Sequence, residues 1–151
     1  KGFYSHFDPT GEQQPFNMRR TIITDDQGRY KFRSVLPKGY GCPPDGPTQA
    51  LLDQLGRHGN RPAHIHFFVT ADDHRKLTTQ INIDGDPLVY DDFAYATREG
   101  LVPPLVERTD EASIKANGMA GPYTEIAFDF ALTALVAGED NQLVHRPRMV
   151  A

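Results

Sequence analysis

The sequence predicts an all-β fold: a β-sandwich of mixed short strands with long structured loops and one or two short helices. Glycine and proline, 13 and 12 of the 151 residues, recur throughout the chain. They fall between short segments rich in β-branched and aromatic residues, and this spacing favours strands over long helices. No internal repeat or low-complexity tract is present, and the length suits one core of ordinary size. We therefore expect a single domain over residues 1–151.

Five segments carry the strand prediction. Residues 21–24 (TIIT) and 29–35 flank a polar turn that ends in glycine, which indicates a strand, a turn and a second strand. Residues 63–70 (AHIHFFVT) and 77–83 (LTTQINI) indicate another pair, joined by a polar connection. Residues 124–132 alternate between apolar and polar side chains, which predicts a further strand.

Two segments favour helix. Residues 48–55 (TQALLDQL) place their leucines on one side of a short helix. Residues 111–117 are expected to form a further helical turn or two. The prolines outside these segments mark irregular loops, and we see no domain boundary among them.

Composition excludes several classes of protein. Hydrophobic residues make up 38% and charged residues 24% of the chain, which argues against a disordered tail. No apolar run approaches the roughly 20 residues that span a bilayer. The net charge of −4 is spread along the chain without a basic cluster, so a nucleic-acid surface is not expected. Cys42 is the single cysteine, which excludes an internal disulfide and, with no signal-like segment, favours the cytoplasm.

His64 and His66 form the sharpest local signal for chemistry. Residues two apart on a strand point to the same face, so both imidazoles would project together as half of a metal site. Phe67 and Phe68 follow the pair and are expected to enclose it, and a buried polar group needs a partner, which a metal would supply. The alternative is two histidines on a solvated face.

The remaining ligands are less clear from the residues alone. A zinc or copper site would need a further ligand, but His74 lies in a polar connection and Cys42 lies among glycine and proline. Phenolic oxygens are the other candidates. Tyr40 is flanked by two glycines, a setting that lets the backbone bend sharply and expose a side chain. Spacing alone does not choose Tyr4 over the other tyrosines.

Residues 2–9, 36–44, 56–68, 76–83 and 90–100 (YDDFAYATREG) strongly resemble the intradiol ring-cleavage dioxygenases, and most closely the bacterial catechol 1,2-dioxygenases. The resemblance covers essentially the whole chain but only the carboxy-terminal catalytic part of the family, whose fold is a β-sandwich. It implies one non-haem Fe(III) ion per domain, held by Tyr4, Tyr40, His64 and His66. Phenolate oxygen is a hard anionic donor that suits ferric iron.

The resemblance also implies the reaction and its substrates. Catechol and O2 would give cis,cis-muconate, with the ring broken between the two hydroxyl-bearing carbons. Tyr40 would leave the metal when catechol binds and take up one of its protons, whereas Tyr4 would stay. Such an enzyme would serve the degradation of aromatic compounds.

Four more residues receive roles from the resemblance. Arg61 would stabilise charge that develops on the substrate ring. Gln80, on the neighbouring strand, would hydrogen-bond near the metal. Phe93 and Ala94 would line the substrate pocket, Phe93 as an aromatic wall and Ala94 as a small residue that leaves room for the ring.

Several alternatives remain open at this point. A chlorocatechol or hydroxyquinol 1,2-dioxygenase would share the iron ligands and differ in the pocket wall. A transthyretin-like β-sandwich that binds a ligand without catalysis would bind no stoichiometric iron. Because the chain starts at Lys1, we expect it to be a fragment that lacks the family's amino-terminal helical region. A homodimer is expected through that region.

Overall fold

The computed structural model describes residue 8 and residues 10–138. These residues form few helices and mostly short strands, which pair into three two-stranded antiparallel sheets. The strands are β1 (Tyr40–Gly41), β2 (Asn60–Arg61), β3 (His64–Val69), β4 (Leu77–Asn82), β5 (Val106–Arg108) and β6 (Tyr123–Glu125). The helices are α1 (Pro47–Gln54), α2 (Glu111–Ala116) and a 3-10 helix, Glu99–Leu101. In this part of the chain, no helix is long and apolar enough to cross a bilayer.

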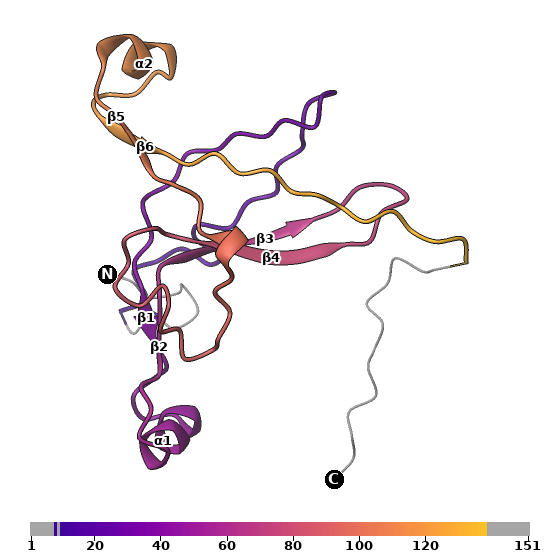
Figure 1. Ribbon diagram of the computed structural model, residues 1–151. Helices are drawn as coiled ribbons and strands as arrows, with labels where there is room; N and C mark the ends of the chain where they lie inside the picture. Colours follow the sequence, from indigo (N-terminus) through magenta and orange to yellow (C-terminus); the bar gives the residue numbers. More distant parts are fainter. Residues whose placement is uncertain (1–7, 9, 139–151) are drawn as a thin grey trace.

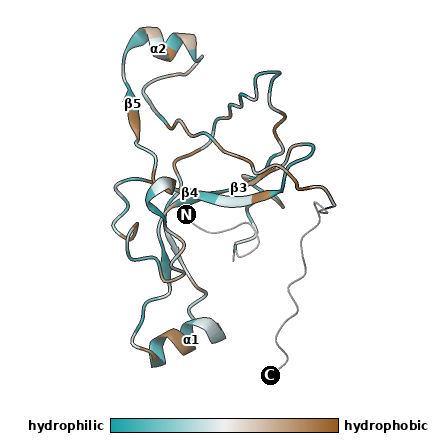
Figure 2. Ribbon diagram, turned by 45° about the vertical axis from the view of Figure 1, so that its right-hand side comes forward, coloured by the Kyte–Doolittle hydropathy of each residue, from teal (hydrophilic) through white to brown (hydrophobic). Residues whose placement is uncertain are grey.

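The hairpin of β3 and β4 occupies the middle of the molecule. α1 and α2 lie at opposite ends of the molecule, on either side of this hairpin (Figures 1 and 2). Its six-residue strands pair over their whole length, from His64 opposite Asn82 to Val69 opposite Leu77. The sequence prediction of a strand pair at 63–70 and 77–83 is therefore confirmed, each strand lying within its predicted bounds.

Both helices form where the sequence predicts them because their ends are well specified. Pro47 starts α1 with a backbone angle that suits the first helical position. Gly56 follows α1 at a φ of 64°, and its N–H and that of the next residue donate to carbonyls of the last turn, a Schellman ending. Asp110 caps α2 by accepting a hydrogen bond from the N–H of Ser113 at 2.7 Å. Gly118 closes that helix in the same way.

The predicted strands at 21–24 and 29–35 are wrong as assigned, although the turn between them forms. Gly28 adopts a φ of 74° and its N–H donates to the carbonyl of Asp25 at 2.8 Å. The flanking residues pair with no strand in the described part of the chain. Their apolar side chains are largely exposed, Ile23 to 87% and Val35 to 68%. A strand needs a ladder partner, and the described residues provide none beside these segments, although Tyr30 packs against Phe67 and Phe130.

The last predicted strand, 124–132, is only partly confirmed. The ladder ends at Glu125, so β6 is shorter than the alternation predicts. The alternation itself persists beyond it, since Ile126, Phe128 and Phe130 are half-buried whereas Ala127 and Asp129 are exposed. Residues 126–130 thus pack one face against the rest of the molecule, although they form no ladder with a described strand.

Two apolar clusters lie along the central hairpin. The buried core sits at the end where β4 finishes and contains Ala63, Ile81, Ile83 and Val89, and Leu52 is buried separately on α1. The second cluster is aromatic and lies on the face of β3 that points away from the histidines, where the Phe67 ring is 4.8 Å from that of Phe130 and 6.4 Å from that of Tyr30. Tyr30 also donates a hydrogen bond to the carbonyl of Phe128 at 2.7 Å.

Ile81→Ala is expected to destabilise the protein by about 2–5 kcal/mol, because it removes a side chain that is 3% exposed and leaves a cavity beside the hairpin. Chemical denaturation measures this change. Ile23→Ala is the matched control, since Ile23 is 87% exposed and its truncation should change the free energy of unfolding by less than about 0.5 kcal/mol. Equal effects in the two variants would contradict this position of the core.

Candidate metal centre

The pairing of four short strands brings together most of the residues predicted for the site. Tyr40 on β1 lies opposite Arg61 on β2, and His66 on β3 lies opposite Gln80 on β4. β2 ends only three residues before β3 begins, so Arg61 and His64 enter the same region from consecutive strands. The outcome is a compact group of nitrogen and oxygen donors beside the buried core.

The two histidines converge as the strand period predicts. Their Nε2 atoms are 3.2 Å apart, and the ring planes are nearly perpendicular at 88°. The Nδ1–H of His64 donates to the carbonyl of Pro62 at 2.7 Å, which leaves its Nε2 with the lone pair. Two imidazole nitrogens that bind one ion side by side, each at about 2.0–2.2 Å, lie about 3 Å apart. The pair therefore fits a shared metal ion.

Both imidazoles are held in the neutral form that a metal requires. Burial lowers the pKa of His64 below its ordinary value, and the positive charge of Arg61 lowers it further. Partial desolvation of the ring and the same guanidinium also lower the pKa of His66, although this side chain is exposed on one side. Among the residues that the structure describes, no further histidine, cysteine or carboxylate completes a group of three. Any further donor among these residues would have to be of another kind. The phenol of Tyr40 is a candidate, because Tyr40 pairs with Arg61 across β1 and β2.

Arg61 is the hub of the polar network. Its Nη1 donates to Nε2 of His64 at 3.1 Å, and its Nη2 donates to Oε1 of Gln80 at 2.9 Å. The opposite edge of the guanidinium pairs with Asp92 at 3.1 Å. Burial lowers the pKa of Arg61, but its hydrogen bonds with Asp92 and with Tyr40 outweigh that effect and raise the pKa above the ordinary value. The cation is thus permanent and fixed in direction.

Tyr40 approaches this network because it is flanked by two glycines. These glycines do not act through a sharp bend of the backbone, as the sequence suggested. Neither glycine has a positive φ. A Cβ at Gly39 would lie 2.7 Å from the carbonyl oxygen of Arg61, and one at Gly41 would lie 2.8 Å from the side chain of Asn60. The glycines therefore permit close approach of β1 to β2 rather than a sharp bend. The Tyr40 ring is 5.5 Å from that of His64.

The expectation that aromatic neighbours enclose the histidine pair is wrong. Phe67 points to the other face of β3, where it joins the aromatic cluster. Phe68 shares the face of the histidines but is 69% exposed, and His66 is itself exposed. The alternation of a strand explains both results, since consecutive aromatics must point to opposite faces. In the described part of the chain, the site is open on the side of His66.

Phe93 and Ala94, predicted to contact substrate, lie on the loop that follows β4. The N–H of Phe93 donates to the carbonyl of Asn60 at 3.2 Å, and its carbonyl accepts from Arg57 at 2.9 Å. The N–H of Ala94 donates to Asp92 at 3.0 Å. These bonds fix the loop next to β2. Tyr4, the remaining predicted ligand, lies outside the described residues.

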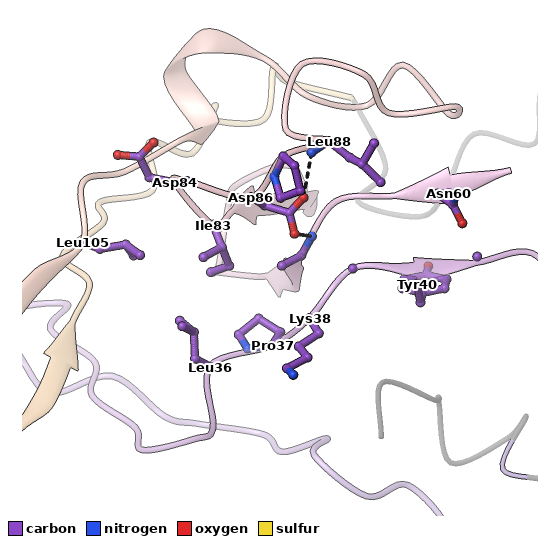
Figure 3. Close-up of a pocket in the computed structure, with 15 residues that line it drawn as sticks. Leu36, Pro37, Lys38, Tyr40, Asn60, Ile83, Asp84, Asp86, Leu88 and Leu105 are labelled. Carbon is purple, nitrogen blue, oxygen red and sulfur yellow. Dashed lines mark hydrogen bonds between the residues drawn. The ribbon is translucent and has the colours of Figure 1, made fainter. Parts of the chain in front are cut away.

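A pocket of about 600 Å³ lies between the segment that leads into β1 and the loop that follows β4 (Figure 3). Its walls are mainly apolar and include Leu36, Ile83 and Leu105. Asp86 lies in it, and its carboxylate accepts hydrogen bonds from the backbone N–H of Ala63 at 3.0 Å and of Leu88 at 2.9 Å. Of the described residues that were predicted for the metal and substrate, only Tyr40 borders this pocket.

Two buried polar residues of the network were missed by the sequence prediction. Asp92 is 4% exposed and pairs with Arg61. Asn82 is fully buried and joins Gln80 to Thr97, accepting from the former at 3.1 Å and donating to the latter at 3.2 Å. The only signal for Asp92 was its place in the acidic-aromatic stretch just before Phe93 and Ala94. Asn82 had a signal in the register, since it lies on β4 two residues after Gln80.

Comparisons with known proteins identify the family of this chain. A family model described as dioxygenase matches residues 1–134. The catechol 1,2-dioxygenase of Acinetobacter baylyi is 72% identical over 149 residues, which are 99% of this chain and 48% of that protein. The catechol 1,2-dioxygenase 1 of Acinetobacter lwoffii is 60% identical over 148 residues, 98% of this chain and 47% of that protein. This chain belongs to the intradiol dioxygenase family.

A solved structure supports the same membership for this intradiol dioxygenase chain. Catechol 1,2-dioxygenase from Acinetobacter sp. ADP1, inhibited by bound mercury, matches with a TM-score of 0.90 and 72% identity over 97% of this chain and 48% of that one. The chain spans about half the length of the relatives that it matches. It corresponds to their carboxy-terminal part, as the sequence resemblance implied.

Proposed function

We propose that this chain is the catalytic part of a catechol 1,2-dioxygenase, which uses one non-haem Fe(III) ion and O2 to convert catechol to cis,cis-muconate. One observation carries the proposal: the Nε2 atoms of His64 and His66 face each other at 3.2 Å, within a network that joins them through Arg61 to Tyr40. The similarity to catechol 1,2-dioxygenases over nearly the whole chain supports this choice of substrate.

The proposed ligands are Tyr4, Tyr40, His64 and His66. Their chemistry fits ferric iron, since two hard phenolates would offset much of its charge and two neutral imidazoles would complete the set. When bound, the ion lowers the pKa of the catechol hydroxyls and makes the ring carbons reactive toward O2. The overall reaction balances without a further reductant, because muconic acid contains every atom of catechol and both atoms of O2.

Tyr40 is proposed as the base of the binding step. As a phenolate displaced from the site by substrate, it would accept a proton from a catechol hydroxyl at its own oxygen. Arg61 lies next to it and interacts with its hydroxyl. The same guanidinium would stabilise the negative charge of the catecholate, whose first proton has gone to Tyr40. The Arg61 cation therefore offsets the negative charge both on the Tyr40 phenolate and, after proton transfer, on the catecholate.

Gln80, Phe93 and Ala94 are proposed to shape the substrate side. Gln80 is 6% exposed and is held between Arg61 and Asn82 by both ends of its amide, so it would fix the guanidinium rather than move. Phe93 and Ala94 lie on the loop anchored to β2, which is the strand of Arg61. A bulkier residue in place of Ala94 would crowd an aromatic ring beside Arg61.

The wider context completes the proposal. We infer one catalytic iron-binding domain over residues 1–151, with a β-sandwich as its architecture, because the chain follows the relative's structure at a TM-score of 0.90. We also propose that the protein works in the cytoplasm as a homodimer, with its interface in the family's amino-terminal helical region. Light scattering of the purified protein would measure the number of subunits.

The experiment that tests the function is a visible absorption spectrum of the purified protein, with its iron content, before and after anaerobic addition of catechol. We expect one iron per chain and a broad band that colours the protein red to purple. Because catechol would replace one phenolate with two of its own oxygens, the band should move to longer wavelength. Admission of air should then yield cis,cis-muconate.

Other outcomes would point elsewhere. A colourless protein with stoichiometric zinc or copper would indicate a different metal at the histidine pair. No stoichiometric metal and no response to catechol would favour a non-catalytic binding protein. A colourless protein with one iron would contradict the tyrosine ligands while leaving the histidines in place.

A further inference from the structure

Asp92 is a buried carboxylate at the junction of the site, and the assigned ligands and catalytic roles do not include it. Its side chain is 1% exposed, and the Arg61 side chain that it pairs with is 11% exposed. Each oxygen accepts two hydrogen bonds. Oδ1 accepts from Nε of Arg61 at 3.1 Å and from the N–H of Ala94 at 3.0 Å; Oδ2 accepts from Nη2 of Arg61 at 3.1 Å and from the N–H of Ala96 at 3.2 Å.

The contacts to Arg61 fix the plane of its guanidinium. A carboxylate that binds two nitrogens of one guanidinium edge leaves that group little freedom to rotate. With Nε and Nη2 held by Asp92, Nη1 is directed at His64 and Nη2 also reaches Gln80. The orientation of the Arg61 guanidinium toward His64 is therefore fixed by Asp92, which binds the Nε and Nη2 atoms.

The contacts to backbone N–H groups fix the substrate loop, which is the segment that carries Phe93 and Ala94. Asp92 closes a turn by bonding the second and fourth residues after it. Phe93, between them, is anchored through its N–H to Asn60 and through its carbonyl to Arg57. One carboxylate thus joins the substrate loop to the cation, and a shift of either would be transmitted to the other.

Asparagine cannot replace aspartate in this position. Its amide has a single acceptor oxygen, and its NH2 group would face donors, Arg61 and the N–H of Ala96 or of Ala94 in either orientation. The substitution would also leave the buried guanidinium without its partner charge. Glutamate would keep the charge, but its extra methylene would displace the loop relative to the guanidinium.

We propose that Asp92 is a positioning residue that holds the guanidinium of Arg61 and the Phe93–Ala94 loop in one fixed relation, and so determines how strictly the enzyme distinguishes catechol from ring-substituted catechols. The inference rests on the proposed function, since the loop and the cation must face the same substrate. It assigns specificity to a residue that itself touches neither metal nor substrate.

The test compares kcat and KM for catechol and 4-methylcatechol in the iron-loaded wild type, Asp92→Asn and Asp92→Glu. Asp91→Asn is the matched control, because Asp91 is the adjacent residue, its side chain is 75% exposed, and its carboxylate pairs with His58 rather than with Arg61. For Asp92→Asn we expect kcat/KM for catechol to fall about 10–100-fold. The ratio of kcat/KM between the two substrates should change at least about threefold, with iron content and the visible band retained.

Asp92→Glu is expected to recover part of the lost kcat, because the guanidinium keeps a charged partner, while its substrate ratio stays altered. It carries the test if Asp92→Asn does not fold. Asp91→Asn should keep both values within about twofold of the wild type. An unchanged substrate ratio in folded Asp92 variants, or losses that simply follow the loss of iron, would overturn the inference and leave the function intact. A wild type that does not cleave catechol would refute the proposed function and the inference with it.

Discussion

His66→Ala is expected to remove the iron and with it the activity. The variant loses one of the two imidazoles whose Nε2 atoms are 3.2 Å apart, so the proposed site would keep a single histidine ligand. We expect the iron content to fall from one per chain to well below one, and kcat/KM for catechol to fall by more than about 100-fold. Metal analysis and O2 uptake measure the two changes independently.

Because His66 is exposed, this test separates loss of iron from loss of folding. Truncation of an exposed side chain on a strand should leave the melting temperature within a few degrees of the wild type, so a loss of iron would not reflect unfolding. His74→Ala is the control, because His74 lies on the connection between β3 and β4 and bonds the carbonyl of Asp72 at 2.7 Å. Full iron content in His66→Ala, or equal losses in both variants, would refute the metal centre.

Tyr40→Phe is expected to abolish most catalysis while the protein still binds iron through the other ligands. The change removes only the hydroxyl, which interacts with Arg61 and is the proposed base. We expect kcat to fall about 10²–10⁴-fold. The visible band should weaken and change position, since one of the two proposed phenolate ligands would be gone. Stopped-flow and steady-state spectra measure both effects on one sample.

Tyr90→Phe is the matched control for this substitution. Tyr90 is 81% exposed and precedes the substrate loop, so loss of its hydroxyl should leave the spectrum and kcat within about twofold of the wild type. A Tyr40→Phe protein with an unchanged band would place the second phenolate at another tyrosine. A changed band with full activity would show that Tyr40 binds the metal but is not the base.

Local sequence was sufficient for the elements whose pattern and ends agree. The β3–β4 hairpin lies within its predicted bounds, because alternation and a polar connection specify it without distant contacts. α1 and α2 lie within one residue of their predictions, because Pro47, Asp110 and the glycines that follow both helices define their ends. The convergence of His64 and His66 followed directly from the strand period.

Segments that depend on a partner were predicted less well. Residues 21–24 and 29–35 have the composition of strands, yet in the described part of the chain no ladder forms beside them. The enclosure of the histidines was also misjudged, because Phe67 and Phe68 point to opposite faces of β3 and only one of them packs. Composition reports what a segment favours, but burial depends on what lies next to it.

The sequence by itself determined that the imidazoles of His64 and His66 lie on one face of a strand and converge. Only the tertiary structure decided that Arg61 is the centre of the network, since its partners His64, Gln80 and Asp92 come from three different segments. It also decided that the glycines beside Tyr40 serve close packing, because the atoms that a Cβ would meet belong to β2. A side chain's neighbours along the chain fix its direction, whereas its partners across space arise only when distant segments pack together.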